Sequence, residues 1–251
     1  MIAIMRPSSN DVNLAKIQEW KSSTDYYSLC QSFDFEAEDI LRYALKDQRP
    51  LDKSAIAKTE IGSRSDLHRG FYCPSPVYDI FVGNVHRGRL MKRLSKKSNN
   101  YYLYGFDCTG KLICADNYVN NQLVSENIYH TDTGVYGIIL DQWGHISHGS
   151  REVYDNGKLV SYSRVLFSHN DGMNHLVNLV NECYTYDPEG LYQCIFTQYV
   201  PSAKLCQQKL YQFQRRQGKL ASYTAATIIG RNSPKVLSVS QEYVVPVDRN
   251  A

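Results

Sequence analysis

The sequence predicts a mainly β protein: a long antiparallel up-and-down meander, curled or barrel-like, that follows a small helical segment at the N-terminus. Three observations predict this fold class. Helical spacing of apolar residues is confined to the start of the chain, strand-like alternation follows it, and turn residues recur at nearly even intervals. The 251 residues are 43% hydrophobic, so the chain is long and apolar enough to bury a core.

The helical pattern covers two stretches near the N-terminus. Apolar residues recur at helical spacing over 11–21, and a clearer stripe runs over 34–48. Asp34 is expected to cap the second helix, and Pro50 is expected to end it. A weaker helical turn is expected over 52–59. We therefore expect helices to precede the strands.

The remainder of the chain follows the two-residue period of β-strands. In the stretch 236–247, Leu237, Val239 and Tyr243 fall on one face and serines on the other. Similar alternation occurs at 101–106, 159–167 and 209–216. The stretch 175–184 fits a helix or a strand, and we favour a strand. Residues 1–62 are thus expected to form a helical segment packed on a meander of repeated hairpins at 63–251, within one structural domain.

Turn signals divide the meander at regular intervals. They fall near residues 88, 99, 110, 121, 134, 144, 157, 172, 190, 203, 218 and 232. The tripeptide Gly-Lys-Leu occurs at 110–112, 157–159 and 218–220, and Gly-Arg-Leu occurs at 88–90. Each hairpin reverses the chain, so every second turn is expected on the same edge of the sheet. The cations that follow these glycines would then form a basic rim for a partner: Arg89, Lys111, Lys158 and Lys219.

The turn motif carries a resemblance to known repeats. The stretch FDCTGKL at 106–112 has the pattern aromatic-Asp-x-x-Gly-Lys-Leu, and YDNGKL at 154–159 is a shortened copy. Over residues 80–230 this pattern resembles the YD-type (Rhs-like) and MORN-like repeats of bacterial proteins. The resemblance implies a β-meander, and it includes cytoplasmic immunity (antitoxin) proteins that bind a toxin domain.

Sequence motifs of catalysis and cofactor binding are weak. The Gly-Lys-Leu turns lack the first glycine and the hydroxyl residue of a phosphate-binding loop. The seven cysteines include no close pair, which is typical of reduced thiols rather than of a zinc site. We therefore predict no catalytic residue, no metal site and no cofactor. One alternative is a metal-dependent or histidine-based hydrolase or nuclease that uses His169, Asp171 and His175, or His145 and His148.

A basic run between residues 87 and 97 supports a second alternative. It contains Arg87, Arg89, Lys92, Arg93, Lys96 and Lys97 without an acidic residue. Such a run is suited to nucleic acid, but strand alternation places its charges on both faces. That distribution favours protection of an edge strand over a nucleic-acid groove.

These observations predict a non-enzymatic, cytoplasmic protein-binding module. The resemblance makes an immunity protein that neutralises a cognate bacterial toxin the first hypothesis. The 20 tyrosines suit an interaction surface, because tyrosine and arginine are enriched at protein interfaces. The first residues show no signal-peptide pattern, and no apolar run spans a bilayer. We predict no membrane partner and no small-molecule ligand.

Overall fold

The computed structural model describes residues 14–46, 51–64, 70–75, 89–94, 98–130, 135–170, 173–188, 190–216, 219–229 and 235–244. Its helices are α1 (Leu14–Lys21), α2 (Thr24–Lys46) and the short 3₁₀ helices η1 (Lys53–Ala55) and η2 (Pro201–Ala203). The first strands are β1 (Lys58–Ser63), β2 (Leu90–Met91), β3 (Tyr101–Phe106), β4 (Leu112–Val119), β5 (Gln122–His130) and β6 (Val135–Asp141). The later strands are β7 (Ile146–Asp155), β8 (Lys158–Asn170), β9 (Met173–Asp187), β10 (Gly190–Val200), β11 (Leu205–Arg216), β12 (Lys219–Ile229) and β13 (Lys235–Val244).

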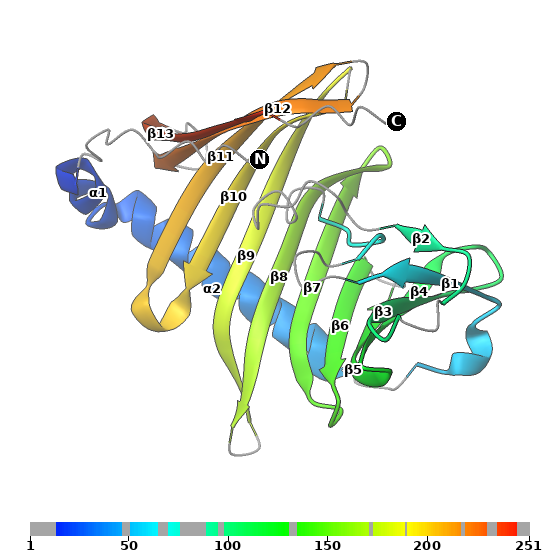
Figure 1. Cartoon of the computed structure of the whole chain (residues 1–251). Coiled ribbons are helices and arrows are strands. Elements are labelled where there is room, and N and C mark those ends of the chain that lie inside the picture. Colours follow the sequence, from blue (N-terminus) through cyan, green and yellow to red (C-terminus); the bar gives the residue numbers. More distant parts are fainter. Residues whose placement is uncertain are drawn as a thin grey trace. The chain divides into compact units, whose positions relative to one another are not determined.

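The strands form the predicted antiparallel up-and-down meander (Figure 1). Their order is β13-β12-β11-β10-β9-β8-β7-β6-β5-β4-β3-β1-β2. Among the described residues the two end strands of this order do not pair, so the sheet is open rather than a closed barrel. Each of the ten turn signals from 110 to 232 lies at or between the ends of consecutive strands. The stretch 175–184 belongs to β9, which confirms the strand prediction.

The start of the sheet departs from a simple meander. β1 lies between β2 and β3 and is antiparallel to both, so the chain passes β1 on its way from β2 to β3. β1 also lies within the stretch expected to be helical, directly after the single turn of η1. The alternation of turns between the two edges therefore holds only from β3 onward.

Helix α2 begins ten residues earlier than predicted. Ser23 caps it, because the Ser23 hydroxyl accepts a hydrogen bond from the backbone N–H of Tyr26 at 3.2 Å. Asp34 lies inside the helix, so the prediction that it is a cap is wrong. One face of α2 is buried along the helix, both before and after Asp34. Its residues recur at helical spacings of three and four: Tyr26, Leu29, Cys30, Phe33, Ala37, Ile40 and Ala44.

The chain divides into two compact units. The first combines residues 1–36 with 179–251, and here the first part of α2 packs on β10 and β11. The rings of Phe33 and Tyr199 lie 5.8 Å apart, and both side chains are fully buried. Asp34 accepts hydrogen bonds at 2.6 Å from the Tyr199 hydroxyl and from Lys204 Nζ. Burial and this acidic partner raise the pKa of Tyr199.

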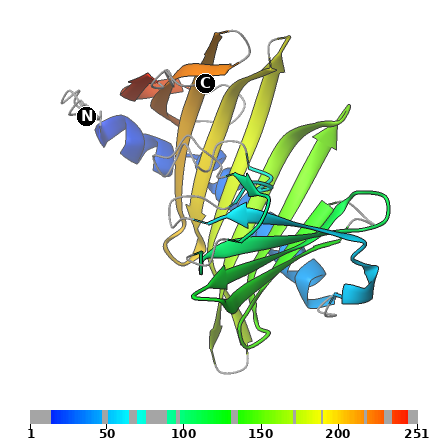
Figure 2. The same ribbon diagram turned by 45° about the vertical axis from the view of Figure 1, so that its right-hand side comes forward.

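The second unit comprises residues 37–178 and is strongly curled. β3, β4 and β5 run at a large angle to β7 and β8 (Figures 1 and 2). On one face, Ile40 of α2 packs so closely on Gly149 of β7 that an added Cβ would lie 2.6 Å from Ile40 Cγ2. Val165 and Phe167 are buried on the same face. Side chains alternate along a strand, so Ser150 and Arg164 belong to the opposite, inner face of this curl.

Candidate functional site

The predicted basic rim is only partly assembled. Lys111 and Lys158 are exposed after the β3–β4 and β7–β8 turns, which lie on the same edge of the second unit. Arg89 is bonded to Ser63, which pairs with Tyr101 at the start of β3, whereas Lys111 follows the end of β3. The prediction that Arg89 shares their edge is therefore wrong, because β1 intervenes between β2 and β3.

Further residues of the predicted sites are the last member of the basic rim, the basic run and the acidic member of the histidine cluster. Lys219 is the first residue of β12, in the other unit. Lys92 and Arg93 of the basic run are exposed. Arg87, Lys96, Lys97 and Asp171 lie outside the described residues.

The opposite turn edge of the second unit carries large exposed apolar side chains. Trp143 in the β6–β7 turn is 73% exposed, and Met173 at the start of β9 is 60% exposed. Leu123 lies beside the β4–β5 turn of the same edge and is also exposed. We call Leu123, Trp143 and Met173 the apolar edge.

Two histidine side chains of this edge, one just before β7 and one at the end of β8, contact each other. The rings of His145 and His169 stack at 4.2 Å with an interplanar angle of 10°. His145 Nδ1 lies 3.5 Å from Asp141 Oδ2, and His169 Nδ1 lies 3.2 Å from Asn174 Oδ1. The sequence groups His145 with His148, and His169 with Asp171 and His175, whereas the ring contact that the structure shows joins His145 to His169. In the part of the chain that the structure describes, no three potential metal ligands of the His, Cys, Asp or Glu type are grouped.

A repeated turn geometry positions Trp143. Asp141 Oδ1 accepts the backbone N–H groups of Trp143 and His145, each at 2.9 Å. Asp107 does the same for Thr109 and Lys111, at 2.8 and 2.9 Å. The Asp-x-x-Gly motif is therefore a structural turn, with its glycine at positive φ: 84° at Gly110 and 82° at Gly144.

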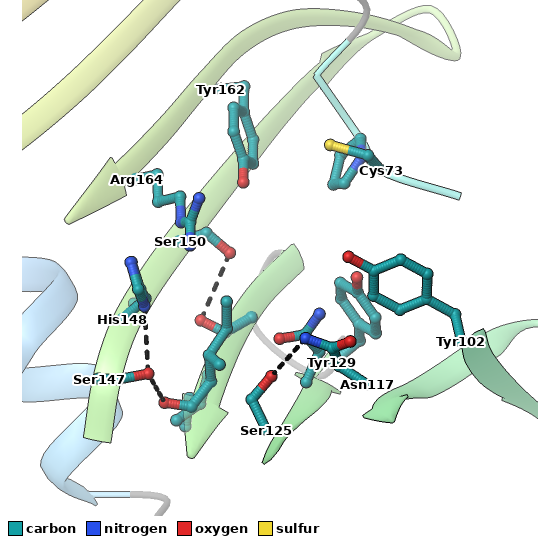
Figure 3. Close-up of a pocket in the computed structure, with 16 residues that line it drawn as sticks. Cys73, Tyr102, Asn117, Ser125, Tyr129, Ser147, His148, Ser150, Tyr162 and Arg164 are labelled. Carbon is teal, nitrogen blue, oxygen red and sulfur yellow. Dashed lines mark hydrogen bonds between the residues drawn. The ribbon is translucent and has the colours of Figure 1, made fainter. Parts of the chain in front are cut away.

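A pocket of about 270 Å³ lies on the inner face of the second unit (Figure 3). Strands β3 to β8 and the segment 70–75 supply its lining. Tyr102, Tyr129 and Tyr162 direct their hydroxyl groups toward this space, and Arg164 lies beside Ser150. Burial raises the pKa of Tyr129 well above its ordinary value, and the neighbouring Tyr162 and Cys73 add to this effect.

The segment 70–75 is fixed over the tyrosines of β3. Gly70 has a φ of 95°, and the N–H of Phe71 donates to the Tyr104 hydroxyl at 2.9 Å. The N–H of Cys73 closes the turn on the carbonyl of Gly70 at 3.2 Å. This turn buries the Cys73 thiol and places it in the pocket wall.

Several polar groups of the pocket wall are already paired. Ser147 donates to the carbonyl of Ile139 at 3.1 Å, and His148 Nδ1 lies 3.1 Å from the Ser147 hydroxyl. Asn127 Oδ1 differs, because it is buried and accepts no hydrogen bond from any described residue. Sequence reasoning missed the pocket, since its residues come from six strands and the segment 70–75 and form no motif.

Neither a protein-family model nor a curated protein sequence matches this chain. Among the described helices, none combines the length and the apolar character needed to cross a membrane. A proposal of function therefore depends on the fold, on the apolar edge and on the pocket of the second unit.

Proposed function

We propose that this chain is a protein-binding module whose partner docks on the apolar edge. The observation that carries the proposal is the 73% exposure of Trp143 on a turn whose backbone is held by Asp141. Tryptophan is enriched among the residues that dominate binding energy at interfaces, because it buries a large rigid surface. A turn whose backbone is held before binding also loses less conformational entropy when the partner docks.

We further propose that the partner is a bacterial toxin domain and that the chain is its immunity protein, acting in the cytoplasm. The resemblance of FDCTGKL and YDNGKL to YD-type repeats supports this class of partner. The cysteines support the location, because all seven are free thiols, which persist in reducing compartments. The apolar edge would then occupy an apolar recess on the toxin domain.

Two edges with different chemistry allow a sharp test. The chain is co-expressed with the product of the adjacent gene, and complex formation is measured by size exclusion and titration calorimetry. We expect a complex that protects the cell from toxicity. Trp143→Ala should weaken it about 30-fold or more, the loss typical of an interface hot spot. The double variant Lys111→Ala, Lys158→Ala is the control, and it should change the affinity by less than about threefold because exposed charges contribute little.

Three outcomes would contradict the proposal. Absence of both complex and protection would exclude this partner class. A loss confined to the lysine double variant would move docking to the basic edge. A homodimer of the chain alone, abolished by Trp143→Ala, would show that a second copy occupies the apolar edge.

A further inference from the structure

The pocket of the second unit has the chemistry of an anion site. Its 16 lining residues include one arginine, one histidine and three tyrosines, and they include no aspartate or glutamate. Arginine remains charged at every physiological pH and offers several N–H donors in a planar fork. Tyrosine and serine hydroxyl groups add neutral donors. The arginine and the hydroxyl groups of this lining can bind a negatively charged group.

The floor of the pocket is one cross-strand row. Tyr129, Gly137, Ser150 and Arg164 face one another in sequence across β5, β6, β7 and β8. Gly137 leaves room in this row, since an added Cβ would lie 2.5 Å from Ser150 Oγ. The absence of a side chain at this position opens the space between the tyrosine ring and the guanidinium group.

The walls suit a flat organic body rather than a bare inorganic ion. Tyr102 and Tyr162 are buried and line the space with ring surface as well as hydroxyl groups. Asn127 adds a buried carbonyl oxygen that accepts no hydrogen bond from the described residues. Native proteins rarely leave such an atom unpaired, so it is suited to a donor from water or from a bound molecule.

We propose that this pocket binds a small organic anion, with its carboxylate or phosphate group on Arg164 and a flat apolar body among Tyr102, Tyr129 and Tyr162. The volume of about 270 Å³ suits a molecule of the size of a single substituted ring. Arg164 is half-buried, and partial burial strengthens the attraction between guanidinium and anion relative to an exposed pair. This site uses none of the residues of the apolar edge.

The proposal is tested with benzoate, phenyl phosphate and the neutral isostere benzamide, using titration calorimetry and amide chemical shifts of the full chain. We expect saturable binding of an anionic probe, with shifts at Tyr129, Gly137, Ser150 and Arg164. Arg164→Gln should lower the association constant about tenfold or more, as loss of a charge-assisted hydrogen bond does. Lys158→Gln removes one exposed charge elsewhere and should leave binding within about twofold.

Further variants keep the result interpretable. Arg164→Lys retains the charge, so it should retain part of the affinity even if Arg164→Gln does not fold. Trp143→Ala should leave anion binding unchanged, which separates this site from protein docking. Equal binding of benzamide and benzoate, no binding of either anion at millimolar concentration, or chemical shifts confined to other strands would each overturn the proposal.

Discussion

The hydroxyl group of Tyr26 makes two hydrogen bonds that attach α2 to the β10–β11 connection. It donates to the carbonyl of Lys204 at 2.8 Å and accepts the N–H of Cys206 at 2.9 Å. Tyr26→Phe would remove this partner from both backbone groups, of which the N–H of Cys206 is buried, so we expect a loss of about 1–3 kcal/mol in the free energy of unfolding. Tyr27→Phe is the matched control, because the neighbouring ring is 63% exposed and its change should be close to zero. Urea unfolding of both variants measures the difference, and equal stabilities would contradict this role.

Glu152 makes stability depend on pH. Its side chain is buried, and Oε2 accepts the Tyr154 hydroxyl at 2.6 Å, whereas Oε1 accepts no hydrogen bond from the described residues. Burial raises the pKa of Glu152, and the hydrogen bond from Tyr154 opposes this rise. The folded state therefore holds this proton to a higher pH than the unfolded state does. Between the two pKa values the free energy of unfolding falls as pH rises, and the loss is complete above the folded pKa.

Glu152→Gln removes this titration. The stability of the variant relative to the wild type should increase as pH rises above about 4.3, where the carboxyl group titrates in the unfolded state, and should level off above the raised folded pKa. The increase should amount to about 1.4 kcal/mol for each pKa unit by which folding raises the pKa of Glu152. Thermal unfolding at several pH values measures it. A stability difference that is constant with pH would contradict the assignment to Glu152.

At the scale of elements, the packing of α2 on β7 depends on one glycine. A Cβ at Gly149 would lie 2.6 Å from Ile40 Cγ2, and Ile40 is fully buried. Gly149→Ala should therefore destabilise the protein by about 1–3 kcal/mol through overpacking. In an Ile40→Ala background the same change should be nearly neutral, because the added methyl group enters the space that Ile40 vacates. A double-mutant cycle measures this coupling, and additive effects would show that the two residues do not compete for space.

Turns are the elements that the sequence predicts best, because the interactions that form a turn are local. Asn156 and Gly157 have φ values of 49° and 76°, the left-handed conformation that Asn-Gly favours in a tight hairpin. The carboxylate of Asp107 fixes its turn within five residues. The sequence does not predict the start of α2, since Asp34 resembles a cap but accepts a hydrogen bond from Tyr199, 165 positions away. The position of β1 between β2 and β3 likewise depends on contacts that no local pattern encodes.

At the scale of the whole molecule, the curvature of the sheet forms the pocket, and the sequence could not predict that curvature. The pocket brings Tyr102 of β3 near Arg164 of β8 only because the sheet of the second unit curls. Most of the lining residues are, taken singly, ordinary positions of alternating strands. The basic rim was predicted from the even spacing of turns, and that regularity fails where β1 interrupts the order of the strands. Regular spacing thus predicts a meander better than it predicts a site.

The seven cysteines report on the integrity of the whole fold. Cys108 in the β3–β4 turn is exposed, Cys183 is intermediate and the other five are buried. Burial raises the pKa of the Cys114 thiol to about 11 and raises that of Cys194, so these groups are protected both by access and by protonation. In the native protein a thiol reagent at pH 8 should modify Cys108 in a fast phase. The buried thiols should react only as the chain unfolds. Until then the reagent cannot reach them, and the raised pKa values keep Cys114 and Cys194 protonated, whereas thiolate is the reactive form.

Cys108→Ser should abolish the fast phase and leave the slow phase unchanged, since this side chain lies in an exposed turn. Global unfolding in denaturant should expose all seven thiols of the wild type and six of the variant. The rate of the slow phase should then follow stability, rising in Tyr26→Phe and not in Tyr27→Phe. Fast reaction of Cys194 or Cys114 in native buffer would contradict the packing of the strands that carry them. Because these two cysteines belong to different compact units, their separate rates also measure the opening of each unit.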